Sequence, residues 1–173
     1  MRTSAYFAFQ SGVCGYGYGA NGVWNDLYSK DGDFGTAFEM PERYMNWYDG
    51  ANLEGAVQMT HLKEFYSAVK WWKLIPEAFF SHTVATLDRE FSAACSSDGN
   101  DTFIVYFYEQ NDSTGALNGL ARGAVYHARW FDPRSGRYTA ISQFVAVDGH
   151  WRIPKKPTAE DWLLIVKRVG QNG

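Results

Sequence analysis

The chain of 173 residues has few cysteines and no long apolar run, and both absences narrow its class. Its two cysteines, Cys14 and Cys95, are far apart in the sequence, which leaves no disulfide framework and no metal-ligand spacing. We expect both to be buried thiols. No stretch of about 18 apolar residues is present, so no membrane span is predicted. The N-terminus, MRTSAYFAFQSG, has no cleavage pattern and indicates an amphipathic helix instead of a signal peptide.

Positive charge is also scarce. The chain has 16 Lys and Arg against 19 Asp and Glu, a net charge of -3. Binding to a nucleic acid depends on Lys and Arg, so this balance argues against such a partner. Aromatic residues, in contrast, make up 17% of the chain, with 7 Trp and 11 Tyr. Their rings combine a flat apolar face with a polar group and suit partners such as sugars.

A glycine-rich stretch, CGYGYGANGVWN at residues 14–25, resembles none of the phosphate-binding loops. Its glycines alternate, no helix is expected directly after them, and no Lys-Ser/Thr pair follows. Two interpretations remain open. The glycines permit tight packing of a strand, or they end a strand at which side chains face a sugar. The candidate sugar-binding residues are Tyr16, Tyr18, Asn21 and Trp24.

The sequence shows no clear catalytic or metal-binding motif. Glycoside hydrolysis needs two carboxyl groups facing one bond, but the acids that follow the glycine stretch lie in a loop or at a helix start. Residues 31–42 place acids at four calcium-ligand positions, although Thr36 occupies the position that needs glycine, which favours a solvated loop over a calcium site. No G-x-S-x-G motif supports a serine hydrolase. We therefore predict neither a metal nor a cofactor.

Hydrophobic periodicity divides the chain into two parts. The first part reads as a helix at 2–11, an extended segment at 13–24, a long loop at 25–51 and an amphipathic helix at 53–70 that Asn52 caps and Pro76 follows. The second part has short segments rich in β-branched and aromatic residues, separated by turn residues, which is typical of an antiparallel β-sandwich. The strand segments are 91–96, 102–109, 124–131, 137–145 and 162–168. Pro133 and Gly136 in WFDPRSGRY favour a turn, which predicts a hairpin between 124–131 and 137–145. We place the boundary between residues 1–75 and 76–173.

Four segments together resemble the C-terminal half of apiosidase-like glycoside hydrolases: RTSAYFAFQSGVCGYGYGANGVWN, GAVQMTHLKEFYSAVKWWKLIP, WFDPRSGRY and DWLLIVKR. This resemblance implies an α+β chain in which the end of a (β/α)8 barrel precedes an antiparallel β-sandwich, sometimes described as collagen-binding. The barrel end would consist of a late helix at 2–11, the last strand at 13–20, its loop at 21–51 and the last helix at 53–70. Tyr18, Asn21 and Trp24 would then lie at the rim of the sugar pocket.

The same resemblance implies that the parent enzyme hydrolyses a complex polysaccharide outside the cytoplasm, in the periplasm or the extracellular space. Its two catalytic carboxylates lie on earlier barrel strands, so no catalytic residue is assigned to this chain. We expect the 173-residue chain to be inactive alone.

A non-catalytic function remains open beside the enzymatic one. The chain could be a carbohydrate-binding module that uses exposed aromatic rings, or a sandwich with a purely structural role. The candidate rings are Trp24, Trp47, Tyr48, Trp71 and Trp72, although Trp71 and Trp72 lie at the domain junction and also fit an interdomain wedge. A barrel fragment would expose apolar surface, so we expect either self-association or packing of residues 1–75 onto the sandwich.

Overall fold

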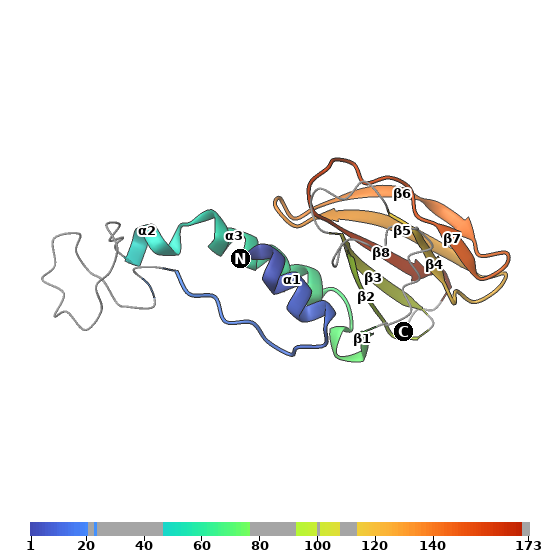
Figure 1. Cartoon of the computed structure of the whole chain (residues 1–173), viewed down its shortest axis with the longest axis horizontal. Coiled ribbons are helices and arrows are strands. Elements are labelled where there is room, and N and C mark those ends of the chain that lie inside the picture. Colours follow the sequence, from blue (N-terminus) through green and yellow to red (C-terminus); the bar gives the residue numbers. More distant parts are fainter. Residues whose placement is uncertain (21–22, 24–46, 77–92, 100, 108–113, 171–173) are drawn as a thin grey trace, which may run out of the picture.

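The computed structural model describes residues 1–20, 23, 47–76, 93–99, 101–107 and 114–170. These residues form three layers: helices, a large sheet and a small sheet (Figure 1). The helical elements are α1 (Arg2–Gln10), α2 (Trp47–Ala51), α3 (Glu54–Ser67) and the 3-10 helix η1 (Trp71–Lys73). The strands are β1 (Ile75–Pro76), β2 (Ala93–Ser97), β3 (Thr102–Phe107), β4 (Ala116–Asn118), β5 (Val125–Asp132), β6 (Arg137–Val145), β7 (His150–Arg152) and β8 (Trp162–Arg168).

The described strands pair only in the antiparallel sense. The large sheet has the order β1-β2-β3-β8-β5-β6, and β4 pairs with β7 in the small sheet. The C-terminal strand β8 therefore lies in the middle of the large sheet, between β3 and β5. A continuous run of apolar residues in β8, WLLIV, is consistent with this position, because a central strand is covered on both faces.

One face of the large sheet packs against the small sheet to form the sandwich core. Alternate residues of the central strands point into this core, as the two-residue period of a strand requires. From the other layer, Leu117 in β4 is buried and Trp151 in β7 packs against the cluster. The remaining buried members include Phe103, Val105, Phe107, Tyr126, Trp130, Leu164 and Val166. This core confirms the predicted β-sandwich.

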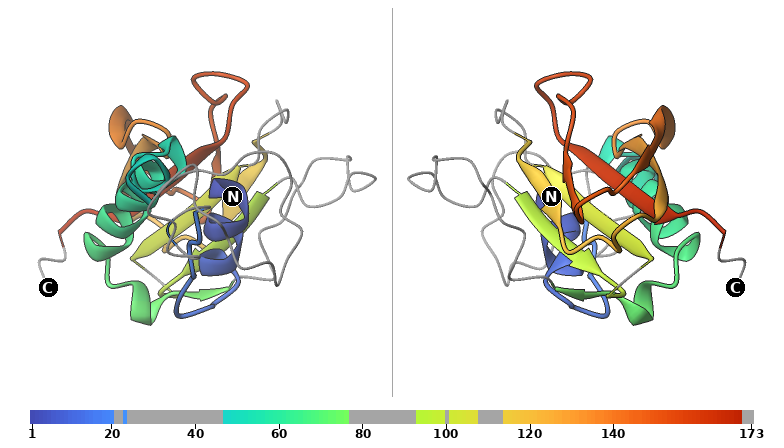
Figure 2. Two further views of the ribbon diagram at one scale, coloured as in Figure 1. Left: turned by 90° about the vertical axis from the view of Figure 1, so that its left-hand side faces the viewer. Right: turned by 90° about the vertical axis from the view of Figure 1, so that its right-hand side faces the viewer.

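The other face of the large sheet packs against α1 and α3. Ile104, Leu163 and Ile165 are almost fully buried beneath the helices, which contribute Tyr6 and Phe65. The ring of Tyr6 stacks on Tyr106 of β3 at 5.2 Å, and Phe65 contacts Phe131 of β5 at 4.7 Å. The helical segment therefore packs onto the sandwich, which is one of the two outcomes that the sequence left open. Figure 2 shows α1 and α3 in front of the strands.

Two polar connections pass through this helix–sheet interface. Arg2 at the start of α1 donates two hydrogen bonds of 2.8 Å to the carboxylate of Asp161, directly before β8. The Asp161 side chain is 1% exposed and also accepts a hydrogen bond from the Tyr106 hydroxyl. At the other end of α1, buried Gln10 donates to the Tyr66 hydroxyl of α3 and accepts from Ser96 of β2. Buried charges and amides are costly unless they are paired, and these groups are.

The segment WFDPRSGRY forms the β5–β6 hairpin, as predicted. At the base of the hairpin Asp132 and Arg137 are opposite each other in the strand register. Gly136 in the turn adopts a φ of +70°, which only glycine tolerates easily. A Cβ atom at Gly136 would lie 2.7 Å from Nδ1 of His61 in α3, so the hairpin also approaches the helical layer closely.

Asp132 organises this hairpin through its carboxylate. Burial alone would raise its pKa, but hydrogen bonds from the side chain and the backbone of Arg134 and from the Ser135 hydroxyl outweigh this and hold the pKa below its ordinary value. A lowered folded-state pKa means that the ionised carboxylate stabilises the fold above an unfolded pKa of about 3.9. That contribution is lost as the pH falls through the lower folded-state value.

We therefore expect the substitution Asp132→Asn to destabilise the protein at neutral pH and to have progressively less effect as the pH falls below about 4. Urea unfolding of both proteins between neutral and strongly acidic pH measures this difference. A difference in unfolding free energy that stays constant with pH would contradict the assigned role of the carboxylate.

Several sequence predictions are wrong in detail. No strand is assigned within residues 13–20, because no described strand lies alongside to pair with this segment. Residues 47–51 form the helix α2, not a loop. Cys14 is exposed, whereas Cys95 is buried as expected. The Asn52 side chain bonds to the Tyr48 carbonyl, so it does not cap α3.

Candidate functional site: an aromatic groove beside α3

A groove lies between the segment after α1 and the helices α3 and η1. Two adjoining cavities, of about 310 and 240 Å³, form it and share four residues: Phe9, Cys14, Tyr66 and Trp71. We call these two cavities together the aromatic groove. The larger cavity is also lined by Tyr16, Tyr18, Met59, Leu62, Lys63 and Ser67, and the smaller by Gly12, Val13, Trp72 and Leu74.

The groove exists because the chain reverses its direction after α1. Gly12 adopts a φ of +83° and its N–H donates to the Phe9 carbonyl, which ends the helix in a tight turn. The following residues then run back alongside α3 (Figure 1). A Cβ atom at Gly12 would lie 3.1 Å from Cγ of Pro76, so a larger residue would be crowded here as well as strained.

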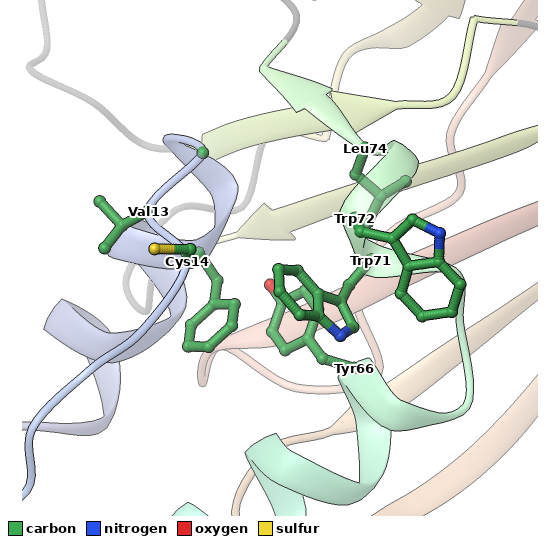
Figure 3. A pocket seen from close by; sticks show the side chains of 8 residues that line it. Val13, Cys14, Tyr66, Trp71, Trp72 and Leu74 are labelled. Atoms are coloured by element: carbon green, nitrogen blue, oxygen red, sulfur yellow. The ribbon is translucent and has the colours of Figure 1, made fainter.

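Aromatic rings from three elements meet in the groove. Phe9 of α1 stacks on Tyr66 of α3, with ring centroids 4.6 Å apart and an angle of 20° between the planes. Trp71, in η1, is half-buried, while Trp72 beside it is 65% exposed. Figure 3 shows the Trp71 and Tyr66 side chains close together and Cys14 across the cavity from them. The result is a partly open surface made mainly of ring faces and edges.

Gly55 of α3 leaves the space that the Tyr18 ring occupies. A Cβ atom at Gly55 would approach the Tyr18 hydroxyl to 3.0 Å, so the absence of a side chain at Gly55 lets the tyrosine pack against the helix. Tyr18 is half-buried, whereas Tyr16 is 36% exposed. Both therefore line the groove, but Tyr16 presents more of its ring to solvent.

The groove contains few groups that could move a proton. Among the residues that the structure describes, its lining includes the Lys63 ammonium, the Cys14 thiol and tyrosine hydroxyls, but no carboxylate. Burial raises the pKa of Tyr66 far above its ordinary value, although the hydrogen bond from Gln10 opposes this effect. A hydroxyl with such a pKa stays protonated at neutral pH. The lining can thus bind an apolar or amphipathic face but lacks the two carboxyl groups of a glycoside hydrolase.

The structure places two of the four predicted sugar-binding residues, Tyr16 and Tyr18, in this groove. Asn21 and Trp24 lie outside the described residues, as does the acidic loop at 31–42. Trp47 and Tyr48 contact each other edge-on in α2 and do not line either cavity. Among the residues that the structure describes, no group of His, Cys, Asp and Glu could hold a metal ion.

Sequence reasoning missed the contributions of Phe9 and Tyr66, because it assigned both to the apolar faces of helices. Tyr66 does belong to the buried face of α3, at helical spacing from Met59 and Leu62. Part of its ring nevertheless reaches the cavity because Gly12 diverts the chain. The sequence does not reveal that Tyr66 belongs both to the core and to the groove. Residues of either kind recur along a helix with the same period.

Comparison with known proteins agrees with this two-part arrangement. Residues 1–73 match the family model described as "Apiosidase-like, catalytic domain", and residues 81–167 match the model described as "Putative collagen-binding domain of a collagenase". A search of curated proteins found no match. No described helix is long and apolar enough to cross a membrane.

Two solved structures share the fold. One, described as a glycoside hydrolase, is 24% identical with a TM-score of 0.76, over 99% of this chain and 37% of its own. The other, a family 5 glycoside hydrolase from Bacteroides vulgatus ATCC 8482, is 22% identical with a TM-score of 0.73, over 99% and 36%. The chain thus spans little more than a third of the length of these proteins.

The fold and the matches define a two-part chain, in which helices that resemble part of an apiosidase-like catalytic domain are joined to an antiparallel β-sandwich. The collagen-binding model matches half of the chain, so the chain belongs to the family described as the putative collagen-binding domain of a collagenase, while its residues 1–73 are similar to the apiosidase-like catalytic domain.

Proposed function

We propose that this chain contributes one wall of a sugar pocket in a glycoside hydrolase that acts on complex polysaccharide outside the cytoplasm. In this proposal residues 1–75 are the end of a (β/α)8 barrel and residues 76–173 are the accessory sandwich. The observation that supports it is the aromatic groove, which Tyr16 and Tyr18 line within the segment that matches the catalytic-domain family. Aromatic rings bind the apolar faces of sugars, and pocket walls of this kind position a substrate for hydrolysis.

The sandwich has a structural role in this proposal. Part of its outer face is covered by α1 and α3 and is connected to them through the Arg2–Asp161 ion pair. Such a continuous buried contact favours a support that holds the helices in place over a tethered module that moves freely.

The chain alone is proposed to bind sugar without cleaving it, because the described part of the groove lining holds no carboxylate. Aryl glycosides of several sugars, incubated with the purified 173-residue protein, should release no aryl group above the buffer rate. Robust hydrolysis would contradict this proposal. The second candidate, a non-catalytic carbohydrate-binding module, shares the binding but belongs to no enzyme, and the partly open groove with exposed Trp72 favours it specifically.

Trp71 provides a test of the groove. Its half-buried ring lines both cavities, so the substitution Trp71→Ala should weaken binding of oligosaccharides by about tenfold, which corresponds to about 1.4 kcal/mol. Binding is measured by titration calorimetry with a panel of plant oligosaccharides. The exposed Trp47 in α2 lies outside the groove, and Trp47→Ala is the matched control that should bind as the wild type does. Equal loss in both variants would contradict a specific groove.

A further inference from the structure

The helical layer covers only part of the outer face of the large sheet. The strand register arranges this face in rows that run across β3, β8, β5 and β6. The first row is Tyr106–Leu163–Phe131–Tyr138, and the second is Ile104–Ile165–Arg129–Ala140. In both rows the residues of β3 and β8 are buried under the helices, whereas those of β6 are exposed. Apolar character therefore decreases toward the β6 edge.

The third row is polar throughout: Thr102–Lys167–His127–Gln143. Lys167 and His127 are directly opposite each other on neighbouring strands, so they share this face, and Arg129 follows His127 on the same face. Directly opposed side chains have Cβ atoms about 5 Å apart, so the Lys167 and His127 side chains are neighbours on this face. We call Arg129, His127, Lys167 and the nearby Lys70 the basic face.

Among the described residues, neither Lys167 nor Arg129 makes an ion pair, and Arg129 instead lies over the Tyr138 ring at 4.1 Å. Partial burial of Lys167 lowers its pKa, and the charges of Arg129 and Lys70 lower it further, while Asp98 opposes this. The charges of Arg129, Lys167 and Lys70 are thus close enough to interact, and the acidic groups that act on this face are Asp98 near Lys167 and Glu64 near Tyr138.

The aromatic ring of Tyr138 lies beside Arg129 on the same face. Tyr138 is 41% exposed, and Arg129 covers part of it. A half-exposed tyrosine beside an arginine suits a ligand that has both a sugar ring and an anionic group. A nucleic acid would need a much larger basic surface, because the affinity of a phosphate backbone comes from many neutralised charges.

We propose that the basic face is a binding site for an anionic polysaccharide, with Lys167 and Arg129 on its acidic groups and Tyr138 against a sugar ring. The site lies on the sandwich and is separate from the aromatic groove. It goes beyond the proposed function and does not depend on hydrolysis or on sugar binding in that groove.

Affinity gel electrophoresis of the whole chain tests this site, with polygalacturonate, chondroitin sulfate, neutral dextran or single-stranded DNA in the gel. Polygalacturonate should retard the wild type, dextran should not, and salt should abolish the effect. The variant Arg129→Gln with Lys167→Gln should bind at least about tenfold more weakly, since two charge-assisted contacts are lost. Retardation by chondroitin sulfate alone would assign the acidic group as sulfate and would equally support the site.

Control variants test whether the loss of binding is specific to the basic face. Lys155→Gln removes one exposed charge from the β7–β8 connection and should bind as the wild type does. Lys167→Gln alone retains the Arg129–Tyr138 contact and should lose part of the affinity, which guards against misfolding of the double variant. An unchanged double variant, equal loss with Lys155→Gln, or stronger retention by DNA than by any polysaccharide would overturn the proposal.

Discussion

Replacement of Asp161 by Ala is expected to destabilise the protein by about 3–5 kcal/mol, which is a large part of the stability of a domain of this size. The substitution leaves Arg2 without the carboxylate that now accepts two hydrogen bonds of 2.8 Å. It also removes the carboxylate that accepts the hydrogen bond of the Tyr106 hydroxyl. Urea unfolding followed by tryptophan fluorescence gives the free energy difference.

The preceding residue supplies the control. Glu160 lies 3.5 Å from Arg134 in an ion pair at the surface, and its side chain is 52% exposed. Surface pairs of this kind contribute about 1 kcal/mol at most, so Glu160→Gln should have a small effect. Similar losses in the two variants would show that the buried pair does not stabilise the helix–sheet contact.

The substitution Phe65→Ala should cost about 3–5 kcal/mol, because it removes a ring from the centre of the helix–sheet interface. Phe65 is 1% exposed and contacts Phe131 of β5 and Tyr66 of its own helix. Since α1, α3 and the sheet share this cluster, the variant should still unfold in a single transition, shifted to lower denaturant.

Val57, in the same helix, provides the matched comparison. Its side chain is 51% exposed, and Val57→Ala should change the unfolding free energy by less than about 0.5 kcal/mol. Two separate transitions in Phe65→Ala, one for the helices and one for the strands, would contradict a shared core.

Local patterns were sufficient to predict most of the fold. The apolar spacing in α3 and the alternation in β5 depend on neighbouring residues only, and both elements were predicted. The short strands β4 and β7, three residues each, were not predicted, because so few residues carry no clear period. The Asp-Pro-Arg-Ser-Gly turn predicted the β5–β6 hairpin correctly, since Gly136 needs a positive φ.

The contact between the two parts could not be predicted in the same way. Tyr6 and Phe65 show an apolar face on each helix, but nothing in their spacing identifies Ile104, Leu163 and Ile165 as the surface they cover. The strands that carry those residues have apolar side chains on both faces, so a second layer must cover the sheet. Their sequence does not identify which segment forms that layer. The groove is a consequence of this packing, so its candidate rings Tyr16, Tyr18, Trp71 and Trp72 were named from the sequence without the groove that brings them together.

The central claim is that the helical segment and the sandwich form one structural unit. Hydrogen exchange of the backbone amides of α1, α3 and β8 under native conditions tests it most directly. We predict that the slowest amides of the two helices open with the same free energy as those of β8, because they share a core and the Arg2–Asp161 pair. Helices that exchange freely while β8 remains protected would contradict the account.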